Sequence, residues 1–447
     1  METSSKWIKE WKPENEKFWK ETGSKIAWRT LIITTFALTL SFATWFMMSA
    51  IVVRLPQIGF KFETMELFWL TAMPGLAGGS LRIIHTFLIP IFGTRRVITL
   101  ATILKLIPCI GLGFAVMNPS TPFWVFLLLS FSAGFGGGDF SSFMPSTSIF
   151  FPKKLQGTAL GIQAGIGNFG VSLAQFVTPW IIGFAIFGGS LGTSQMLTNP
   201  AGTKPIWLQN AAFWYVPLLL IIALLAWFYL RSVPVKATFK EQLDIFKNKH
   251  TWYCTIIYVM TFGSFSGFSA AFPLLIKIIY GKFPGAPDPL AYAFLGPLIG
   301  SLMRVVSGPI SDKTGGAILT HITGIGLIIG VLVMAFAGLL TPDSLDQFPY
   351  FVGLMLFIFF LTGIGNASTF RQFPIIFSHS PRQGAGVLGW TAAVAAYGPF
   401  IFSILIGYTI TQTGSAGYFF IGAAIFYSIA TFINWKYYTR KGCEKPS

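Results

Sequence analysis

The stretch from Arg231 to His250 reads RSVPVKATFKEQLDIFKNKH and is the longest polar segment after the N-terminal tail. Apolar runs of about 20 residues, the length needed to cross a hydrocarbon core, lie on both sides of it. Counting outward from this segment gives six such runs before it and six after it. The polar segment therefore predicts a linker between the two halves of an all-α membrane protein.

The composition of the chain agrees with this prediction. Of 447 residues, 53% are hydrophobic and 10% are charged, whereas a soluble domain carries about 25% charged residues. Most of the chain is therefore expected to face lipid. The twelve predicted transmembrane helices are residues 31–53, 67–92, 97–117, 122–146, 157–187, 210–230, 251–279, 289–311, 316–340, 349–377, 385–411 and 416–438.

The net charge of +16 would favour a nucleic-acid partner in a soluble chain, but here it reflects topology. With the N-terminus inside, 22 of the 31 Lys and Arg residues fall in the cytoplasmic tails, loops and linker. Positive charge concentrates in cytoplasmic loops of membrane proteins, so both termini are predicted to be cytoplasmic and the chain to span the plasma membrane. The predicted division is 1–30 N-terminal tail, 31–230 first six-helix half, 231–250 linker, 251–438 second six-helix half and 439–447 C-terminal tail.

Sequence features recur between the halves at a nearly constant offset. An offset of 222 pairs Arg82 with Arg304, an offset of 229 pairs glycines and prolines of the fourth helix with those of the tenth, and an offset of 228 pairs glycines of the fifth helix with those of the eleventh. Parallel repeats of this kind are the arrangement of the major facilitator superfamily, in which substrate binds near the midplane between the halves. We therefore expect a major facilitator fold of twelve transmembrane helices.

The loop after the eighth predicted helix reads GPISDKTGG, residues 308–316, and resembles a cytoplasmic loop signature of that superfamily. The resemblance implies that Asp312 and Lys313 form gating salt bridges. An ordinary polar turn is the alternative interpretation.

Two arginines, Arg82 and Arg304, are predicted deep in membrane helices. An arginine placed there costs a few kcal/mol or more, so it should face an aqueous cavity or have a partner. Two guanidinium forks pointing across the interface between halves suit a planar oxyanion bound by bidentate hydrogen bonds. The alternative is neutralisation by internal carboxylates, but of 15 acidic residues only Asp139 lies well inside a predicted helix. One carboxylate cannot neutralise two arginines, so the sequence predicts an anionic substrate.

Two glycine-rich segments carry a more specific resemblance. Residues 133–152 read AGFGGGDFSSFMPSTSIFFP and residues 161–172 read GIQAGIGNFGVS. Together with LRIIHTFLIPIFG at 81–93 and TFGSFSGFSAAF at 261–272, they resemble the nitrate/nitrite porter family over nearly the whole chain.

This resemblance implies that the two arginines bind nitrate or nitrite. It implies that the rings of Phe140 and Phe262 stack above and below the planar anion, and that Asn168 and Tyr258 are polar contacts. Without the motifs, either phenylalanine would be assigned to packing, because the chain contains 47 of them.

Coupling is where the chain departs from the best-known exchangers of that family, which have Asn at the place of Asp139. The loop HSPRQGAG and the helix GVLGWTAAVAAYGPFIF, residues 386–402, look more like the branch assigned to nitrate/proton symport. An ionised Asp139 would compete for an arginine, and its protonation would release that arginine for nitrate. The alternatives are a permanent ion pair between Asp139 and a neighbouring arginine, or a tolerated substitution.

The preferred function is a secondary active transporter that takes up nitrate by alternating access with proton symport. A nitrate/nitrite antiporter, a carrier of another small anion, and an anion channel or sensor on the same fold are the alternatives. No cofactor, metal site, enzymatic activity, nucleic acid or obligate protein partner is expected. His85 is interpreted as a packing residue, and Arg371 and Lys277 as side chains that reach toward the membrane interface.

Overall fold

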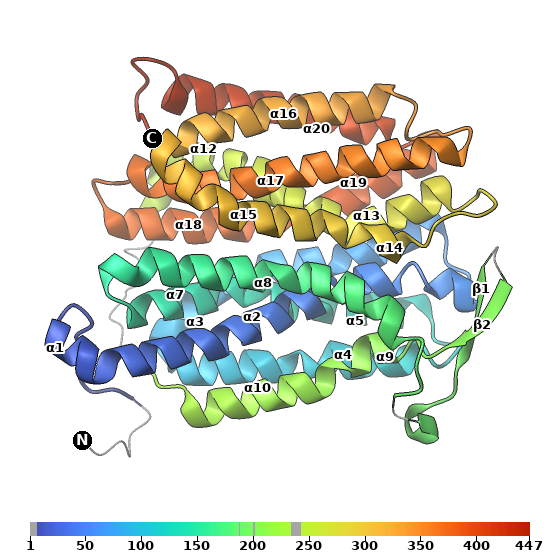
Figure 1. Ribbon diagram of the computed structural model, residues 1–447, viewed down its shortest axis with the longest axis horizontal. Helices are drawn as coiled ribbons and strands as arrows, with labels where there is room; N and C mark the ends of the chain where they lie inside the picture. Colours follow the sequence, from blue (N-terminus) through green and yellow to red (C-terminus); the bar gives the residue numbers. More distant parts are fainter. Residues whose placement is uncertain (1–6, 187, 200–201, 234–242) are drawn as a thin grey trace.

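The computed structural model describes residues 7–186, 188–199, 202–233 and 243–447. Most of the predicted linker, residues 234–242, lies outside this range. In Figure 1, the elements before the linker lie in the lower part of the molecule and those after it in the upper part. We call these two groups of helices the first half and the second half.

The first half contains helices that run back and forth across the molecule, together with one hairpin. Its elements are α1 (Glu16–Phe18), a π-helical turn (Trp19–Gly23), α2 (Ser24–Ile51), a 3₁₀ turn (Leu55–Ile58), α3 (Thr64–Leu104), α4 (Leu106–Ala115), α5 (Phe123–Ala133), α6 (Phe135–Gly138), α7 (Phe140–Phe150), α8 (Lys153–Ile181), a 3₁₀ turn (Gly188–Leu191), β1 (Gln195–Asn199), β2 (Gly202–Ile206), α9 (Asn210–Phe213) and α10 (Tyr215–Tyr229).

The second half repeats the helical pattern. Its elements are a 3₁₀ turn (Leu243–Lys247), α12 (Lys249–Tyr258), a π-helical turn (Val259–Gly263), α13 (Ser264–Tyr280), α14 (Pro289–Ala293), α15 (Leu295–Thr314), α16 (Gly316–Phe336), a 3₁₀ turn (Leu345–Gln347), α17 (Phe348–Ile376), α18 (Pro381–Ala395), α19 (Gly398–Thr413), α20 (Gly417–Asn434) and a final π-helical turn (Trp435–Thr439).

The predicted spans correspond to these helices. In the described residues, eleven helical stretches are long and apolar enough to cross a membrane. The remaining predicted span is α8, a glycine-rich helix of 29 residues that is not among the eleven. The prediction of an all-α membrane fold is confirmed, with one exception: an antiparallel hairpin pairs Gln195 of β1 with Ile206 of β2.

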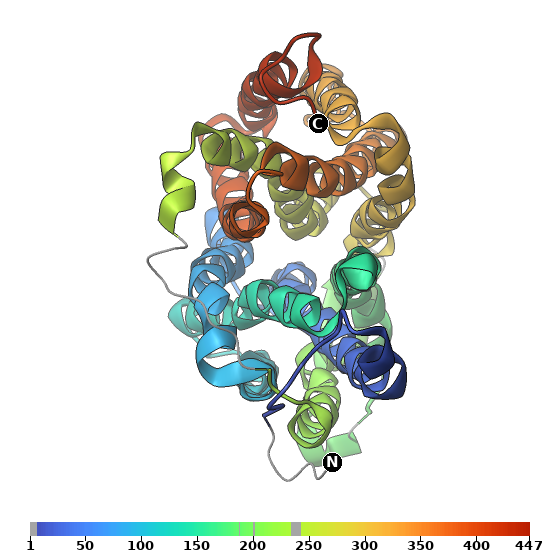
Figure 2. The same cartoon turned by 90° about the vertical axis from the view of Figure 1, so that its left-hand side faces the viewer.

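α1 and the C-terminus lie at the same end of the molecule, on the left of Figure 1, and the hairpin lies at the opposite end. We call these the terminal end and the far end. Figure 2 views the molecule from the terminal end and shows the two halves side by side. The second predicted span and the first part of the third form α3, whose two helical parts meet at Gly93, where a φ of 76° favours glycine, and α4 continues the third span.

Glycines bring the helices of the first half into backbone contact. A Cβ atom on Gly136 of α6 would lie 2.1 Å from the Ser41 carbonyl oxygen, and one on Gly170 of α8 would lie 2.1 Å from the Thr39 carbonyl oxygen. Small residues permit this close approach in membrane helices. The glycine-rich segments therefore pack α6 and α8 directly against α2.

This packing predicts the effect of one added methyl group. Gly170→Ala forces a Cβ atom against the Thr39 carbonyl oxygen of α2. Overpacking of this kind destabilises the folded state by about 1–3 kcal/mol. We expect a clear fall in the melting temperature of the purified protein in detergent. Gly422→Ala is the matched control, because no atom lies within 4 Å of its added Cβ. Equal melting temperatures for the two variants would contradict the tight packing of α8.

Candidate functional site

The two predicted arginines lie buried between the halves. Arg82 of α3 is 0% exposed and Arg304 of α15 is 7% exposed. Arg82 donates from Nε to the Gly137 carbonyl at 2.8 Å and from Nη1 to the Ala392 carbonyl of the second half at 2.7 Å. Within the described part of the chain, Nη2 of Arg82 and both terminal nitrogens of Arg304 have no hydrogen-bond partner. Buried donors without partners are costly, so these N–H groups are available to a ligand.

Aromatic rings surround both guanidinium groups. The ring of Phe262 lies 5.3 Å from Arg82 Cζ and 6.0 Å from Arg304 Cζ, so it stands between the two arginines. Phe140 lies 4.9 Å from Arg82, and Phe370 lies 4.7 Å from Arg304. The rings exclude water and offer their faces to the cations. Phe262 itself lies in the π-helical turn between α12 and α13, and such turns are frequent at functional sites.

The predicted polar contacts also belong to this site. The ring of Tyr258 stacks on Phe262 with centroids 5.5 Å apart, and its hydroxyl is within electrostatic range of both arginines. Asn168 of α8 is fully buried, and neither atom of its amide has a partner in the described residues. It shares one face of α8 with Ser172, which donates to the Phe294 carbonyl just before α15 at 3.1 Å. Asn168 therefore faces the helix that carries Arg304.

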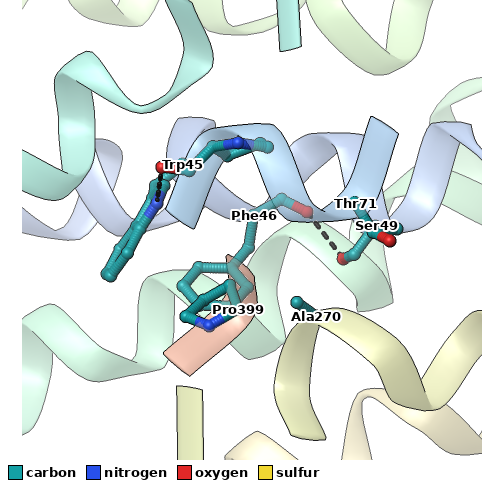
Figure 3. Close-up of a pocket in the computed structure, with 7 residues that line it drawn as sticks. Trp45, Phe46, Ser49, Thr71, Ala270 and Pro399 are labelled. Carbon is teal, nitrogen blue, oxygen red and sulfur yellow. Dashed lines mark hydrogen bonds between the residues drawn. The ribbon is translucent and has the colours of Figure 1, made fainter. Parts of the chain in front are cut away.

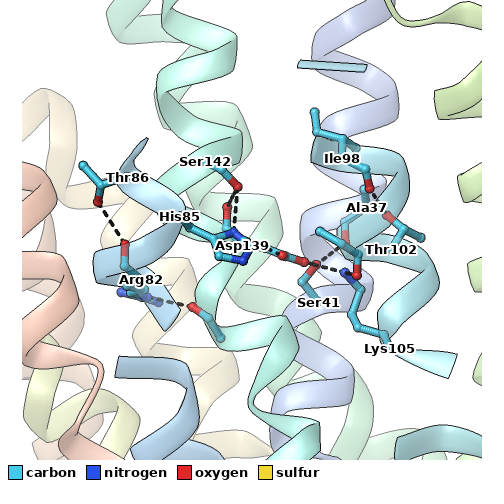
Figure 4. Close-up of polar contacts among 12 residues, drawn as sticks. Ala37, Ser41, Arg82, His85, Thr86, Ile98, Thr102, Lys105, Asp139 and Ser142 are labelled. Carbon is cyan, nitrogen blue, oxygen red and sulfur yellow. Dashed lines mark hydrogen bonds and ion pairs between the residues drawn. The ribbon is translucent and has the colours of Figure 1, made fainter. Parts of the chain in front are cut away.

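Asp139 lies beside the arginines but is paired with a lysine. The Asp139 carboxylate forms an ion pair with Lys105, and it accepts a hydrogen bond from Ser41 at 2.6 Å (Figure 4). One interpretation of the sequence paired Asp139 permanently with a neighbouring arginine. An ion pair is present, but its cation is not an arginine. The cation is Lys105, which reaches Asp139 from the turn between α3 and α4. His85 is a hydrogen-bonded packing residue, with Nδ1 3.0 Å from Ser142 Oγ.

The predicted gating loop contains an ion pair within the second half. Asp312 binds Arg371 of α17 at 2.8 Å, so Arg371 has a partner at the surface rather than only reaching for the interface. Lys313 is exposed. A second ion pair at the terminal end joins Arg382 to Asp244, and the Arg382 guanidinium lowers the pKa of that carboxyl below its usual value. The gating role of Asp312 and Lys313 stays a prediction.

At the far end, polar contacts join the two halves. Arg54, 4% exposed after α2, forms an ion pair with Asp288 before α14. Lys277 of α13 donates to the Val53 carbonyl, and Gln175 of α8 donates to the Ser269 carbonyl at 2.8 Å. We call the Arg54–Asp288 and Lys277–Val53 contacts the far-end lock. Further inward, a small cavity of about 10 Å³ lies beside Trp45 and Pro399 (Figure 3).

Toward the terminal end the halves separate. Between described residues, no hydrogen bond or ion pair joins the halves on the terminal side of the Arg82–Ala392 contact. A Cβ added to Gly161 of α8, Gly308 of α15 or Gly389 of α18 would meet no atom within 4 Å. By contrast, a Cβ on Gly165, one turn closer to the far end, would lie 2.8 Å from Val305. The site is thus closed at the far end and lies at the level where the halves begin to separate.

The site contains residues that the sequence analysis did not assign to it. Phe370 packs on Arg304 and Trp45 packs on Arg82, at 4.7 and 5.3 Å from the respective guanidinium carbons. Lys105, which binds Asp139, was given no role from the sequence. The one signal that could have identified its partner is that Asp139 is the single carboxylate well inside a predicted span.

Comparisons with known proteins agree with this fold. The model of the Major Facilitator Superfamily matches residues 35–378. A protein of Thermus thermophilus named "Probable nitrate/nitrite antiporter NarK2" is 64% identical over 441 residues, which cover 98% of each chain. The chain belongs to the nitrate/nitrite porter family of the major facilitator superfamily. It is a membrane transporter and not an enzyme.

Other relatives extend the likeness. The nitrate/nitrite transporter NarU of Salmonella typhimurium is 39% identical, with 97% of this chain and 96% of that protein covered. Among solved structures, a bacterial homologue of the human lysosomal transporter Spinster has a TM-score of 0.66 at 16% identity, covering 92% of this chain and 96% of its own. At that identity the likeness shows the fold alone.

The far-end lock predicts a shift in conformation when it is broken. Asp288→Asn removes the charge that holds Arg54, so the state that is closed at the far end loses stability. We expect labelling of Gly161→Cys by a thiol reagent to become slower, because the cysteine enters a closed interface more often. The three native cysteines are buried and give a low background. Asp343→Asn, in a far-end turn, is the control, and unchanged labelling in Asp288→Asn would refute the lock.

Proposed function

We propose that this transporter moves nitrate across the plasma membrane by alternating access, with nitrite as the counter-substrate. The observation that carries the proposal is the set of unpartnered N–H groups on Arg82 and Arg304, buried between the halves and bordered by aromatic faces. A planar oxyanion accepts two parallel hydrogen bonds from a guanidinium fork. Relatives that are 64% and 39% identical carry names that include nitrate and nitrite.

The charge balance of the site supports movement with the anion bound. Among the described residues, neither Arg82 nor Arg304 forms an ion pair with a carboxylate. Closing the halves around two uncompensated cations is unfavourable, because like charges repel strongly in a medium of low dielectric constant. A bound monovalent anion offsets part of this repulsion. Anion binding therefore favours the closed intermediate that carries substrate across.

The partner of Asp139 supports one coupling mode over the other. The symport hypothesis requires an ionised Asp139 to compete for an arginine, but this carboxylate is held by Lys105 and Ser41. Exchange of nitrate for nitrite needs no titrating group, because either anion occupies the same arginines. We therefore favour antiport, with nitrate/proton symport as the second candidate. The charge pattern of the tails and loops supports a cytoplasmic location of the terminal end.

Uptake of labelled nitrate into proteoliposomes separates the two modes. We expect internal nitrite to accelerate uptake at equal pH on both sides, and an imposed proton gradient without internal anion to have little effect. Liposomes without protein are the control. Uptake that follows the proton gradient and ignores internal nitrite would establish symport, and no uptake under either condition would refute nitrate transport.

If Arg82 holds the anion by two parallel hydrogen bonds, which we call the bidentate model, Arg82→Lys should have a severe effect on nitrate binding. An ammonium keeps the charge but cannot reproduce the planar fork or reach both carbonyls that now hold Arg82. A lost charged hydrogen bond costs about 1.5–3 kcal/mol, so we expect the apparent affinity for nitrate to fall at least about tenfold. Arg440→Lys, at the exposed C-terminal segment, is the matched control. Near-normal affinity in Arg82→Lys would remove the bidentate model.

A further inference from the structure

A buried polar cluster lies directly behind the anion site, and its members come from different helices. Asp139, Lys105 and Ser41 form its centre, and His85 borders it (Figure 4). The side chains of Asp139 and Lys105 are both 0% exposed. Lys105 is fixed further by donating to the Ala101 carbonyl at 2.9 Å. A buried ion pair gives little net stability, so its presence beside the site calls for another explanation.

We infer that Lys105 is a positioning residue that masks the Asp139 carboxylate from Arg82 and so keeps this arginine available to the anion. The inference rests on the proposed function and extends it, because it identifies the residue on which anion binding at neutral pH depends. The nature of the substrate is unchanged: a small monovalent oxyanion.

The position of Asp139 makes the masking necessary. Asp139 directly precedes Phe140, whose ring packs on Arg82, and it follows Gly137 by two residues. The Gly137 carbonyl accepts a hydrogen bond from Arg82 Nε, and Arg82 is within electrostatic range of the carboxylate. A carboxylate this close to a buried guanidinium would bind it in preference to an exchangeable anion, because the carboxylate is tethered to the protein.

Few other charged groups face this carboxylate. On α3, His85 Nδ1 lies 3.7 Å from Asp139 Oδ1, but His85 is hydrogen-bonded to Ser142. The neighbouring helices carry their basic residues at the terminal end of the molecule, away from the cluster. These residues are Lys25 and Arg29 on α2, Lys153 and Lys154 on α8, and Arg382 on α18. Lys105 is therefore the cation that competes with Arg82 for Asp139.

The second half has no equivalent of this pair. Ser368 occupies the place that corresponds to Asp139, and it forms a neutral hydrogen bond with Thr320 at 2.8 Å. Arg304 thus has no carboxylate to be protected from, and it needs no masking cation. The lysine is present only in the half that contains the competing acid.

The test uses Lys105→Met in proteoliposomes with the same pH on both sides. At about pH 8 the unmasked carboxylate should bind Arg82, so we expect nitrate uptake to fall at least about tenfold. The loss should appear as a raised KM for nitrate, and a saturating concentration of nitrate should restore part of the rate, because the tethered carboxylate and the anion compete for the same arginine. The maximal rate of uptake should change much less.

Matched variants separate masking from a loss of folding. Lys105→Met combined with Asp139→Asn should regain uptake with a KM near that of wild type, because the competitor is absent, and Lys105→Arg should retain uptake because it keeps the charge. Lys61→Met, an exposed lysine at the far end, is the control. A double variant as inactive as Lys105→Met, or the same KM for nitrate in Lys105→Met and wild type, would overturn the inference.

A second measurement is independent of transport. In Lys105→Met, the infrared stretching band of the Asp139 carboxylate should shift from its wild-type position, because its partner changes from Lys105 to Arg82, and the band is identified by its absence from the double variant. If wild type fails to transport nitrate but this shift is present, the proposed function is wrong and the masking stands. If the band has the same position in Lys105→Met and wild type, the masking is wrong.

Discussion

The structure depends on two guanidinium groups that are buried in a membrane protein and that pair with no carboxylate in the described part of the chain. In such surroundings an unsatisfied charged donor is unfavourable by several kcal/mol. Two carbonyl oxygens hold part of Arg82, and aromatic rings cover both cations, yet three terminal nitrogens have no partner among the described residues. These free N–H groups are suited to binding an anion. The need to accommodate two buried cations and an anion explains why polar and aromatic residues from many helices converge at one level of the molecule.

Glycine is the means by which the helices reach this arrangement. A side chain at Gly136 would collide with the Ser41 carbonyl, and one at Gly137 would lie 2.7 Å from the ring of Trp45. Because these side chains are absent, α6 approaches α2 and α3 closely enough for the Gly137 carbonyl to accept from Arg82. Replacing these glycines by larger residues would therefore alter the orientation of Arg82 by moving the Gly137 carbonyl that holds it.

The helices and the arginine pair could be predicted from the sequence, because hydropathy is local along the chain and the repeat makes Arg82 and Arg304 equivalent. Phe140 and Phe262 required the resemblance to a family, since nothing local distinguishes them from other phenylalanines. Lys105 could not be matched to Asp139, because 34 residues separate them and their contact depends on the rotation of two helices. The Arg54–Asp288 pair, 234 residues apart, escaped prediction for the same reason.

The two arginines are equivalent in sequence but differ in their hydrogen bonds, and this difference bears on how the halves move. Arg82 is held by a carbonyl of its own half and by the Ala392 carbonyl of the other half, whereas the terminal nitrogens of Arg304 have no partner in the described residues. Rocking of the halves must therefore break or stretch the Arg82–Ala392 bond, while Arg304 is able to follow the anion. A bound anion that bridges the arginines replaces the broken contact between halves with one that travels with the site.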